Sequence, residues 1–132
     1  MVSALAVTGW RVVTPEGLVE GGVLVRDGRI TAIGRFDNPA DAETIDAKGK
    51  LIAPGLIDVG VFAIDRPAFV AGGITRAVLM PDRGQIETVA LVQHAAASGK
   101  PKVWVHPLAA ATRGLEGREL AEIGLMARDG AC

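Results

Sequence analysis

The stretch LIAPGLIDVGVFAID at residues 51–65 decides the fold of this 132-residue chain, because the sequence pattern changes within it. Before Pro54, short strand-forming segments are separated by turn signals. After Pro54, the nearly continuous apolar run over residues 55–63 is typical of a strand buried on both faces, as in a parallel sheet. We therefore expect a β-rich part at residues 1–53 and a part with alternating strands and helices at residues 54–132.

The first part, from residue 4 to about residue 53, predicts a β-meander. Asp27-Gly28 lies between two apolar segments and is a strong signal for a tight hairpin, because such turns need positive φ angles. Gly49 indicates a second turn of this kind. The polar residues 35–42 include a proline and indicate an exposed loop.

The second part repeats a strand followed by a helix three times. Such a succession predicts a parallel sheet, because each helix returns the chain to the start of the next strand. Gly99 with Pro101 marks the end of the middle helix. We expect strands at residues 55–63, 74–81 and 102–110, and helices at residues 66–73, 85–98 and 117–130.

Composition limits the possible partners and compartments. Lys and Arg number 14 against 15 Asp and Glu, and only 4% of residues are aromatic, which indicates no nucleic-acid partner. The lone Cys132 cannot form an internal disulfide, so we expect a reducing, cytoplasmic location. No signal-peptide pattern and no apolar run of about 18 residues is present, so neither export nor membrane insertion is expected. With 49% hydrophobic residues, however, some apolar surface is expected to meet a partner.

Four segments carry a family resemblance. They are VLVRDGRITAIG (23–34), IDAKGKLIAPGLID (45–58), GGITRAVLMPD (72–82) and LAAATRGLEGRELAEIG (108–124). The chain resembles the N-terminal part of the amidohydrolase superfamily, and the last two segments resemble its dihydroorotase branch, close to dihydropyrimidinases and allantoinases. The resemblance implies an α/β fold. A β-sandwich portion of the urease-type composite domain at residues 1–53 would precede the first three βα units of a TIM-type (β/α)8 barrel at residues 54–132; a whole barrel takes about 250 residues.

The resemblance also identifies positions where the family's chemistry is missing. The family's first barrel strand ends in His-x-His, with both imidazoles on one face so that they reach one zinc ion. Gly60 and Phe62 occupy these positions and offer no metal donor. Ile64 replaces an Arg that binds the substrate carboxylate, and Asp82 replaces a substrate-binding Asn with a charge that repels anionic dihydroorotate. The stretch between the strand and Gly72-Gly73 is also shortened, and the family's remaining ligands correspond to positions beyond Cys132. We therefore predict no catalytic, substrate-binding or metal-binding residue and no zinc.

For several single residues a structural role is the simpler expectation. His106 is expected at the C-terminal end of the third strand, where barrel enzymes hold their sites, but a lone His is more often a packing residue. His94 is expected in the last turn of a helix, and Asp58 in a structural hydrogen bond. Gly72-Gly73 closes a short helix and lacks the form of a phosphate loop. Ser98 and Thr75 have no His and Asp partners in a triad pattern.

Two interpretations remain open at this point. In the first, the protein is a pseudoenzyme of the dihydroorotase type that self-associates or supports aspartate carbamoyltransferase in pyrimidine biosynthesis, as inactive homologues in the family do. In the second, it is the N-terminal part of a zinc-dependent cyclic-amide hydrolase. A fragment of a longer protein is compatible with either, and fold alone does not decide between them.

Overall fold

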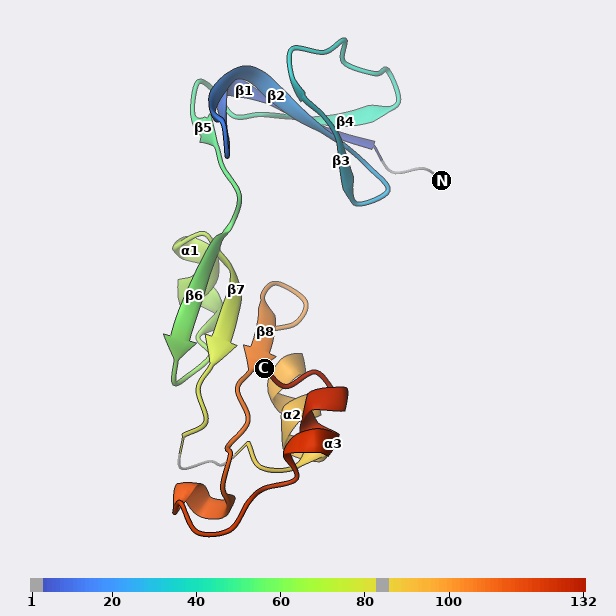
Figure 1. Cartoon of the computed structure of the whole chain (residues 1–132). Helices are drawn as coiled ribbons and strands as arrows, with labels where there is room; N and C mark the ends of the chain where they lie inside the picture. Colours follow the sequence, from blue (N-terminus) through green and yellow to red (C-terminus); the bar gives the residue numbers. More distant parts are fainter. Residues whose placement is uncertain (1–3, 83–85) are drawn as a thin grey trace. The chain divides into compact units, whose positions relative to one another are not determined.

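The computed structural model describes residues 4–82 and 86–132, with Trp10 described by its backbone alone. The chain forms two compact units, Met1–Pro54 and Gly55–Cys132. Figure 1 shows strands alone in the first unit and alternating strands and helices in the second. This α/β architecture, a β-rich part followed by three βα units, confirms the predicted fold class.

The first unit is a five-stranded sheet with the order β3-β2-β1-β4, in which β5 also pairs with β1. Its antiparallel strands are β1 (Ala4–Thr14), β2 (Gly17–Arg26) and β3 (Arg29–Gly34). The predicted meander is correct for these three strands and wrong for the next two. Both β4 (Ala42–Asp46) and β5 (Leu51–Ile52) run parallel to β1, because the loop after β3 carries the chain to the free edge of that long strand.

The turns of this unit agree with the sequence. Asp27 and Gly28 have φ angles of 51° and 72°, which confirms the tight hairpin. Gly49 has a φ angle of 77°, which confirms the turn between β4 and β5. The loop at residues 35–41 is tied down by Asp41, whose carboxylate accepts hydrogen bonds of 3.1 and 3.2 Å from Arg26. These hydrogen bonds lower the pKa of Asp41 below its ordinary value.

The second unit is a parallel sheet with the order β6-β7-β8. Its strands are β6 (Leu56–Val61), β7 (Ile74–Leu79) and β8 (Trp104–Pro107), and its helices are α1 (Arg66–Ala71), α2 (Val89–Ala97) and α3 (Ile123–Arg128). Helix α1 packs on β7, α2 packs on β8, and α3 packs on α2. In the part of the chain that the structure describes, no helix has the length and apolar character needed to span a bilayer.

Helix α2 begins later than predicted, because Thr88 ends the preceding extended segment and caps the helix. Its hydroxyl accepts a hydrogen bond from the Leu91 backbone N–H at 3.4 Å. The helix therefore starts at Val89, and Gln85, the expected first residue, lies outside the described residues. Asp65 caps α1 in the same way, accepting a hydrogen bond from the Ala68 N–H at 3.1 Å.

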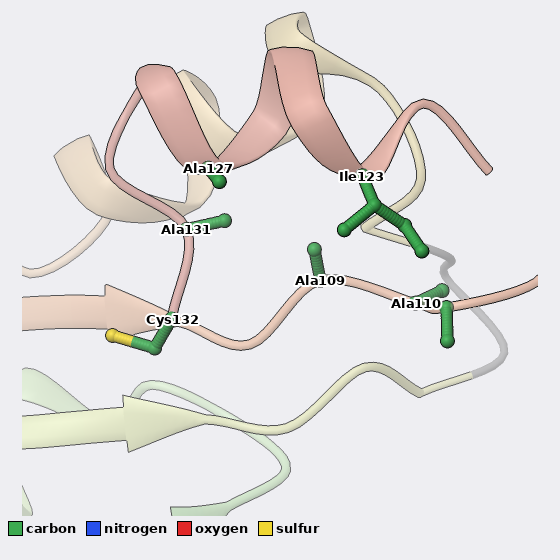
Figure 2. Close-up of a pocket in the computed structure, with 7 residues that line it drawn as sticks. Ala109, Ala110, Ile123, Ala127, Ala131 and Cys132 are labelled. Carbon is green, nitrogen blue, oxygen red and sulfur yellow. The ribbon is translucent and has the colours of Figure 1, made fainter.

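The third predicted helix, over residues 117–130, is only partly correct. Residues 117–122 are not helical, because their backbone pairs with the preceding segment: Arg113 donates to the Glu119 carbonyl at 2.9 Å, and Ala121 donates to the Ala111 carbonyl at 3.0 Å. A short 3-10 helix, η1 (Arg113–Leu115), lies in that segment. Figure 2 shows Ile123 and Ala127 of α3 directed toward Ala109 in the segment after β8, where they line a small apolar pocket of about 140 Å³.

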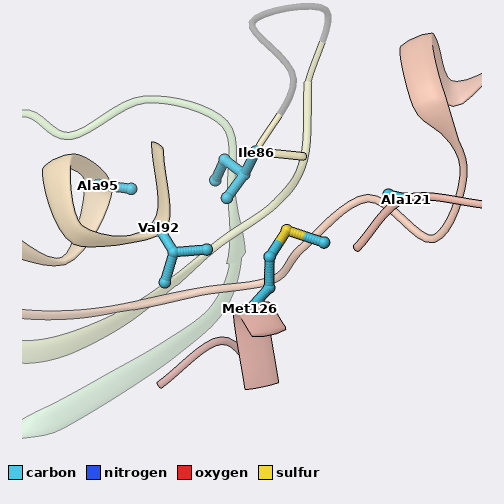
Figure 3. Close-up of a cluster of buried hydrophobic side chains, with 5 residues drawn as sticks. All are labelled: Ile86, Val92, Ala95, Ala121 and Met126. Carbon is cyan, nitrogen blue, oxygen red and sulfur yellow. The ribbon is translucent and has the colours of Figure 1, made fainter. Parts of the chain in front are cut away.

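Two hydrophobic clusters hold the second unit together. One joins α1 to the sheet through Phe69, Ala77 and Val103. The other joins α2 to α3, and Figure 3 shows the fully buried Met126 of α3 beside Val92 of α2. Ile86, Ala95 and Ala121 complete this second cluster. Both clusters lie on the helical side of the sheet.

The other face of this sheet is open. Because side chains alternate along a strand, Ile57 and Val59 of β6 project away from the face on which Ala77 is buried. They are 60% and 75% exposed, and Trp104 of β8 is 56% exposed. In a closed (β/α)8 barrel this face points to the interior. We call the surface of Ile57, Val59, Arg76, Val78, Trp104 and His106 the open face.

Candidate functional site at the strand ends

Gly60 interrupts β6 near its C-terminal end. Its φ angle of 124° is one that residues with a Cβ rarely adopt, and the register with β7 shifts between Val59 and Val61. A Cβ built at Gly60 would meet open space, so the constraint is the backbone conformation and not crowding. Phe62 follows the strand and is 65% exposed. The end of β6 therefore presents a glycine and a phenyl ring.

A depression of about 370 Å³ lies beside this strand end. Phe62 and Ile64 line it from the segment after β6, and Asp82 lines it from the segment after β7. His94 and Ser98 line it from α2 and its C-cap. The structure thus brings together five residues that the sequence analysis considered separately. The remaining lining residues are all apolar, namely Ala63, Leu79, Met80, Ile86, Leu91 and Ala95.

The depression does not fit a zinc ion. A zinc site needs at least three protein ligands in a near-tetrahedral arrangement, and the lining offers only the Asp82 carboxylate and the His94 imidazole. The Ser98 hydroxyl donates a 2.6 Å hydrogen bond to the Ala95 carbonyl. Across residues 4–82 and 86–132, no three His, Cys, Asp or Glu side chains lie close enough together to hold a metal ion.

His106 lies apart from the depression, on the open face of the sheet. Its Nε2 is 3.0 Å from Nη1 of Arg76 on the neighbouring strand. A guanidinium only donates hydrogen bonds, so Nε2 is the acceptor and the ring proton is on Nδ1. The Arg76 guanidinium also lies 5.8 Å from the centre of the Trp104 ring. The sequence analysis missed Arg76; its one signal is a charged residue inside the strand segment ITRAVL, whose other residues are uncharged.

The other residues considered from sequence have local placements. His94 is in the last turn of α2, as predicted. The backbone N–H groups of Gly72 and Gly73 bond to the Ala68 and Val70 carbonyls, which confirms that the pair closes α1. Asp58 is half-buried on the helical side of β6, in register with Ala77.

Three further residues considered from sequence also lie outside any catalytic arrangement in the described part of the chain. The Thr75 hydroxyl lies 3.5 Å from the Leu56 carbonyl, to which it donates. Cys132 is exposed and has its backbone N–H bonded to the Pro107 carbonyl at 2.9 Å. The Ser98 hydroxyl donates its hydrogen bond to the Ala95 carbonyl of α2, so its proton is directed at the helix backbone and not at a catalytic base.

Comparison with known proteins identifies the class. A scan against family models finds no match. Among solved structures, L-hydantoinase (dihydropyrimidinase) from Arthrobacter aurescens superposes with a TM-score of 0.76 and 27% identity, covering 99% of this chain and 32% of that one. A mutant N-acetyl-D-glucosamine-6-phosphate deacetylase from Mycobacterium smegmatis superposes with a TM-score of 0.57 at 17% identity, which shows the fold alone. The fold is that of part of an amidohydrolase barrel with its β-rich N-terminal portion.

Sequence relatives narrow the class. The dihydroorotase of Pelotomaculum thermopropionicum is 38% identical over 144 residues, and that of Syntrophotalea carbinolica is 37% identical over 146 residues. Each alignment covers 96% of this chain and 34% of the relative. The chain is thus similar to curated dihydroorotases over nearly all of its own length and to an amidohydrolase structure, the hydantoinase, and it spans about a third of the length of the curated relatives it matches.

Proposed function

We propose that this protein is a non-catalytic dihydroorotase-like protein that acts in pyrimidine biosynthesis by associating with aspartate carbamoyltransferase. The observation that carries the proposal is the end of β6. The family resemblance places two zinc-binding imidazoles there, and the chain has Gly60 and Phe62. Gly60 has a backbone conformation that disfavours any side chain, so this strand end is built for a residue without a donor.

The neighbouring substrate positions support the same proposal. Ile64 is half-buried and packs against the cluster of Phe69, Ala77 and Val103, so it serves the core where the family has an anion-binding Arg. Asp82 brings a negative charge to the depression, which disfavours a dihydroorotate carboxylate at that position. Two substrate contacts and two metal ligands are thus replaced together.

The exposed apolar surface of the second unit favours association. Parallel sheets are normally covered on both faces, and this one has an open face and two strand edges that the described residues leave unpaired. A partner that covers this surface removes apolar side chains from water. Light scattering should therefore show an associated protein. A dilute, well-folded monomer of 13.6 kDa that binds no hydrophobic dye would contradict this expectation.

The second candidate is a zinc-dependent cyclic-amide hydrolase of which this chain is the N-terminal part. Its zinc ligands would then come from later residues of the same protein. The 38% identity to a dihydroorotase favours it, together with the fact that the match spans a third of that enzyme. The two candidates differ in turnover. Under the first, the protein purified at the full length at which its own cell expresses it, and supplied with zinc and dihydroorotate, shows no hydrolysis above background; under the second, that protein hydrolyses dihydroorotate.

Mixing tests the proposed partner. Aspartate carbamoyltransferase from the same cell is combined with the purified protein, and the mass of the complex and the transferase activity are both measured. We expect a larger complex and a change in transferase activity. If the transferase neither co-purifies nor changes in activity, the proposed partner is wrong.

A further inference from the structure

A groove on the helical side of the second unit carries two positively charged side chains. Its volume is about 330 Å³, and its walls come from two segments that are far apart in the sequence. Arg66, Pro67 and Val70 of α1 form one wall, and Pro101 and Lys102 of the segment before β8 form the other. The open face of the sheet takes no part in this groove, and both walls belong to the described chain.

One hydrophobic cluster holds the two walls together. Phe69 of α1 and Val103, which directly follows Lys102, are both buried in the cluster that also contains Ala77. Because core side chains pack closely, burying these two together fixes the backbone on either side of the groove. The position of the walls is therefore set by the core of the unit.

Hydrogen bonds fix the walls further. Nη1 of Arg66 donates to the Lys100 carbonyl at 3.3 Å, which ties this arginine to the opposite wall. In that wall the backbone N–H groups of Lys102 and Val103 donate to the Gly99 carbonyl at 3.2 and 2.9 Å. A guanidinium has five N–H donors, and the bond to Lys100 uses one of them. Four donors of Arg66 thus stay available to a ligand in the groove.

The two positive charges have no carboxylate partner in the part of the chain that the structure describes. None of the ion pairs among residues 4–82 and 86–132 includes Arg66 or Lys102. Asp65 precedes Arg66 in the chain, but its carboxylate caps α1 by accepting from the Ala68 N–H at 3.1 Å. Both cations are exposed, so an anion can reach them from solvent.

A phosphoryl group matches this pair of charges. Near pH 7 a phosphate monoester carries a charge of about −1.5 to −2 and has three strong acceptor oxygens. A guanidinium binds two such oxygens through its planar fork, and a lysine ammonium adds a point charge with three donors.

The rest of the groove is apolar. Pro67 and Pro101 contribute their rings, and Val70 contributes its methyl groups. A free phosphate ion would leave these apolar side chains exposed to water, whereas the organic part of a phosphorylated molecule would cover them. Small-molecule sites commonly combine such apolar walls with a few polar groups that fix the orientation of the ligand.

We propose that this groove binds a small phosphorylated organic molecule. The phosphoryl group lies between Arg66 and Lys102, and the organic part lies against Pro67, Val70 and Pro101. The proposal goes beyond the proposed function, because it involves neither the end of β6 nor aspartate carbamoyltransferase.

The test uses phenyl phosphate as the probe, with inorganic phosphate and benzoate for comparison. Isothermal titration calorimetry is carried out on the full-length protein as its own cell expresses it. We expect phenyl phosphate to bind more tightly than inorganic phosphate, because its ring covers the apolar walls. It should also bind more tightly than benzoate, which carries a single negative charge, and added salt should weaken its binding.

Variants locate the site. Arg66→Gln and Lys102→Gln should each weaken the binding of phenyl phosphate about tenfold or more, because each removes a charge-assisted contact. The matched controls are Arg118→Gln and Lys50→Gln, which change exposed cations that do not line the groove. These controls should leave the dissociation constant unchanged, and circular dichroism checks that all four variants fold.

Four results would overturn the inference. They are no binding of phenyl phosphate, equal binding by Arg66→Gln and Lys102→Gln, benzoate bound as tightly as phenyl phosphate, or inorganic phosphate bound as tightly as phenyl phosphate. Aspartate carbamoyltransferase takes no part in this assay. Failure here therefore leaves the proposed partner standing, and failure of the mixing experiment leaves the proposed groove site standing.

Discussion

Replacing Gly60 by alanine tests whether the end of β6 is conformationally closed to a metal-binding side chain. Gly60 has a φ angle of 124°, outside the left-handed region that Asn or Asp tolerates and in a region populated almost entirely by glycine. No atom lies within 4 Å of a Cβ built there, so crowding contributes nothing to the effect. The cost of forcing a side chain into such a conformation is about 1–3 kcal/mol.

The matched control is Gly124→Ala. Gly124 lies within α3, has no positive φ angle, and also has open space around a built Cβ. Alanine is favoured over glycine inside a helix by about 0.8–1 kcal/mol, so this variant should be neutral or more stable. The two changes are chemically identical and are predicted to have opposite signs.

Urea unfolding followed by circular dichroism measures both variants under one set of conditions. We expect Gly60→Ala to lower the free energy of unfolding by about 1–3 kcal/mol and Gly124→Ala to leave it unchanged or raise it. If the free energy of unfolding of Gly60→Ala lies within about 0.5 kcal/mol of that of the wild-type protein, the backbone at residue 60 does not exclude a side chain. The position could then hold a histidine without strain.

The remaining predictions concern the site, the core and one ion pair. The double variant Gly60→His with Phe62→His should show no dihydroorotase turnover, because the substrate positions are still replaced; measurable hydrolysis would show that the rest of a site survives. Met126→Ala should lower the free energy of unfolding by about 2–5 kcal/mol, since Met126 of α3 is fully buried against α2. A loss below about 1 kcal/mol in urea unfolding would show that neighbouring side chains move in to fill the space left by Met126. Arg26 lowers the pKa of Asp41 from 3.8, so the pair stabilises the protein above that pH and the contribution is lost as the pH falls through the lowered value. The Asp41→Asn variant should lack this part of the pH dependence of the free energy of unfolding. If its pH profile is the same as that of the wild-type protein, the pair does not contribute to stability.

The sequence predicted those features of the fold that depend on residues adjacent to one another in the chain. The Asp27-Gly28 hairpin and the end of α1 at Gly72-Gly73 follow from the φ preferences of the residues themselves. The pairing of β4 with β1 was missed, because strand order depends on which edge is free after a loop crosses the sheet. The third helix was predicted too long. The helical spacing of apolar residues continues back through residues 117–122, but their backbone is hydrogen-bonded to residues 111–113.

The candidate site was predictable only in part, for a similar reason. Gly60 and Phe62 could be compared with a family motif because the motif is local in the chain. Arg76 and His106 are 30 residues apart, and only the register of β7 with β8 brings them to 3.0 Å. The depression likewise joins Phe62 to His94 through the packing of α2 beside the strand ends, which no spacing in the sequence reveals.

Metal content tests the central claim most directly. The purified protein is incubated with excess zinc, dialysed, and measured by elemental analysis alongside an active dihydroorotase treated in the same way. We expect far less than one zinc ion per chain, because Gly60 and Phe62 offer no donor and the described residues assemble no group of three ligands. One zinc ion retained per chain would contradict it.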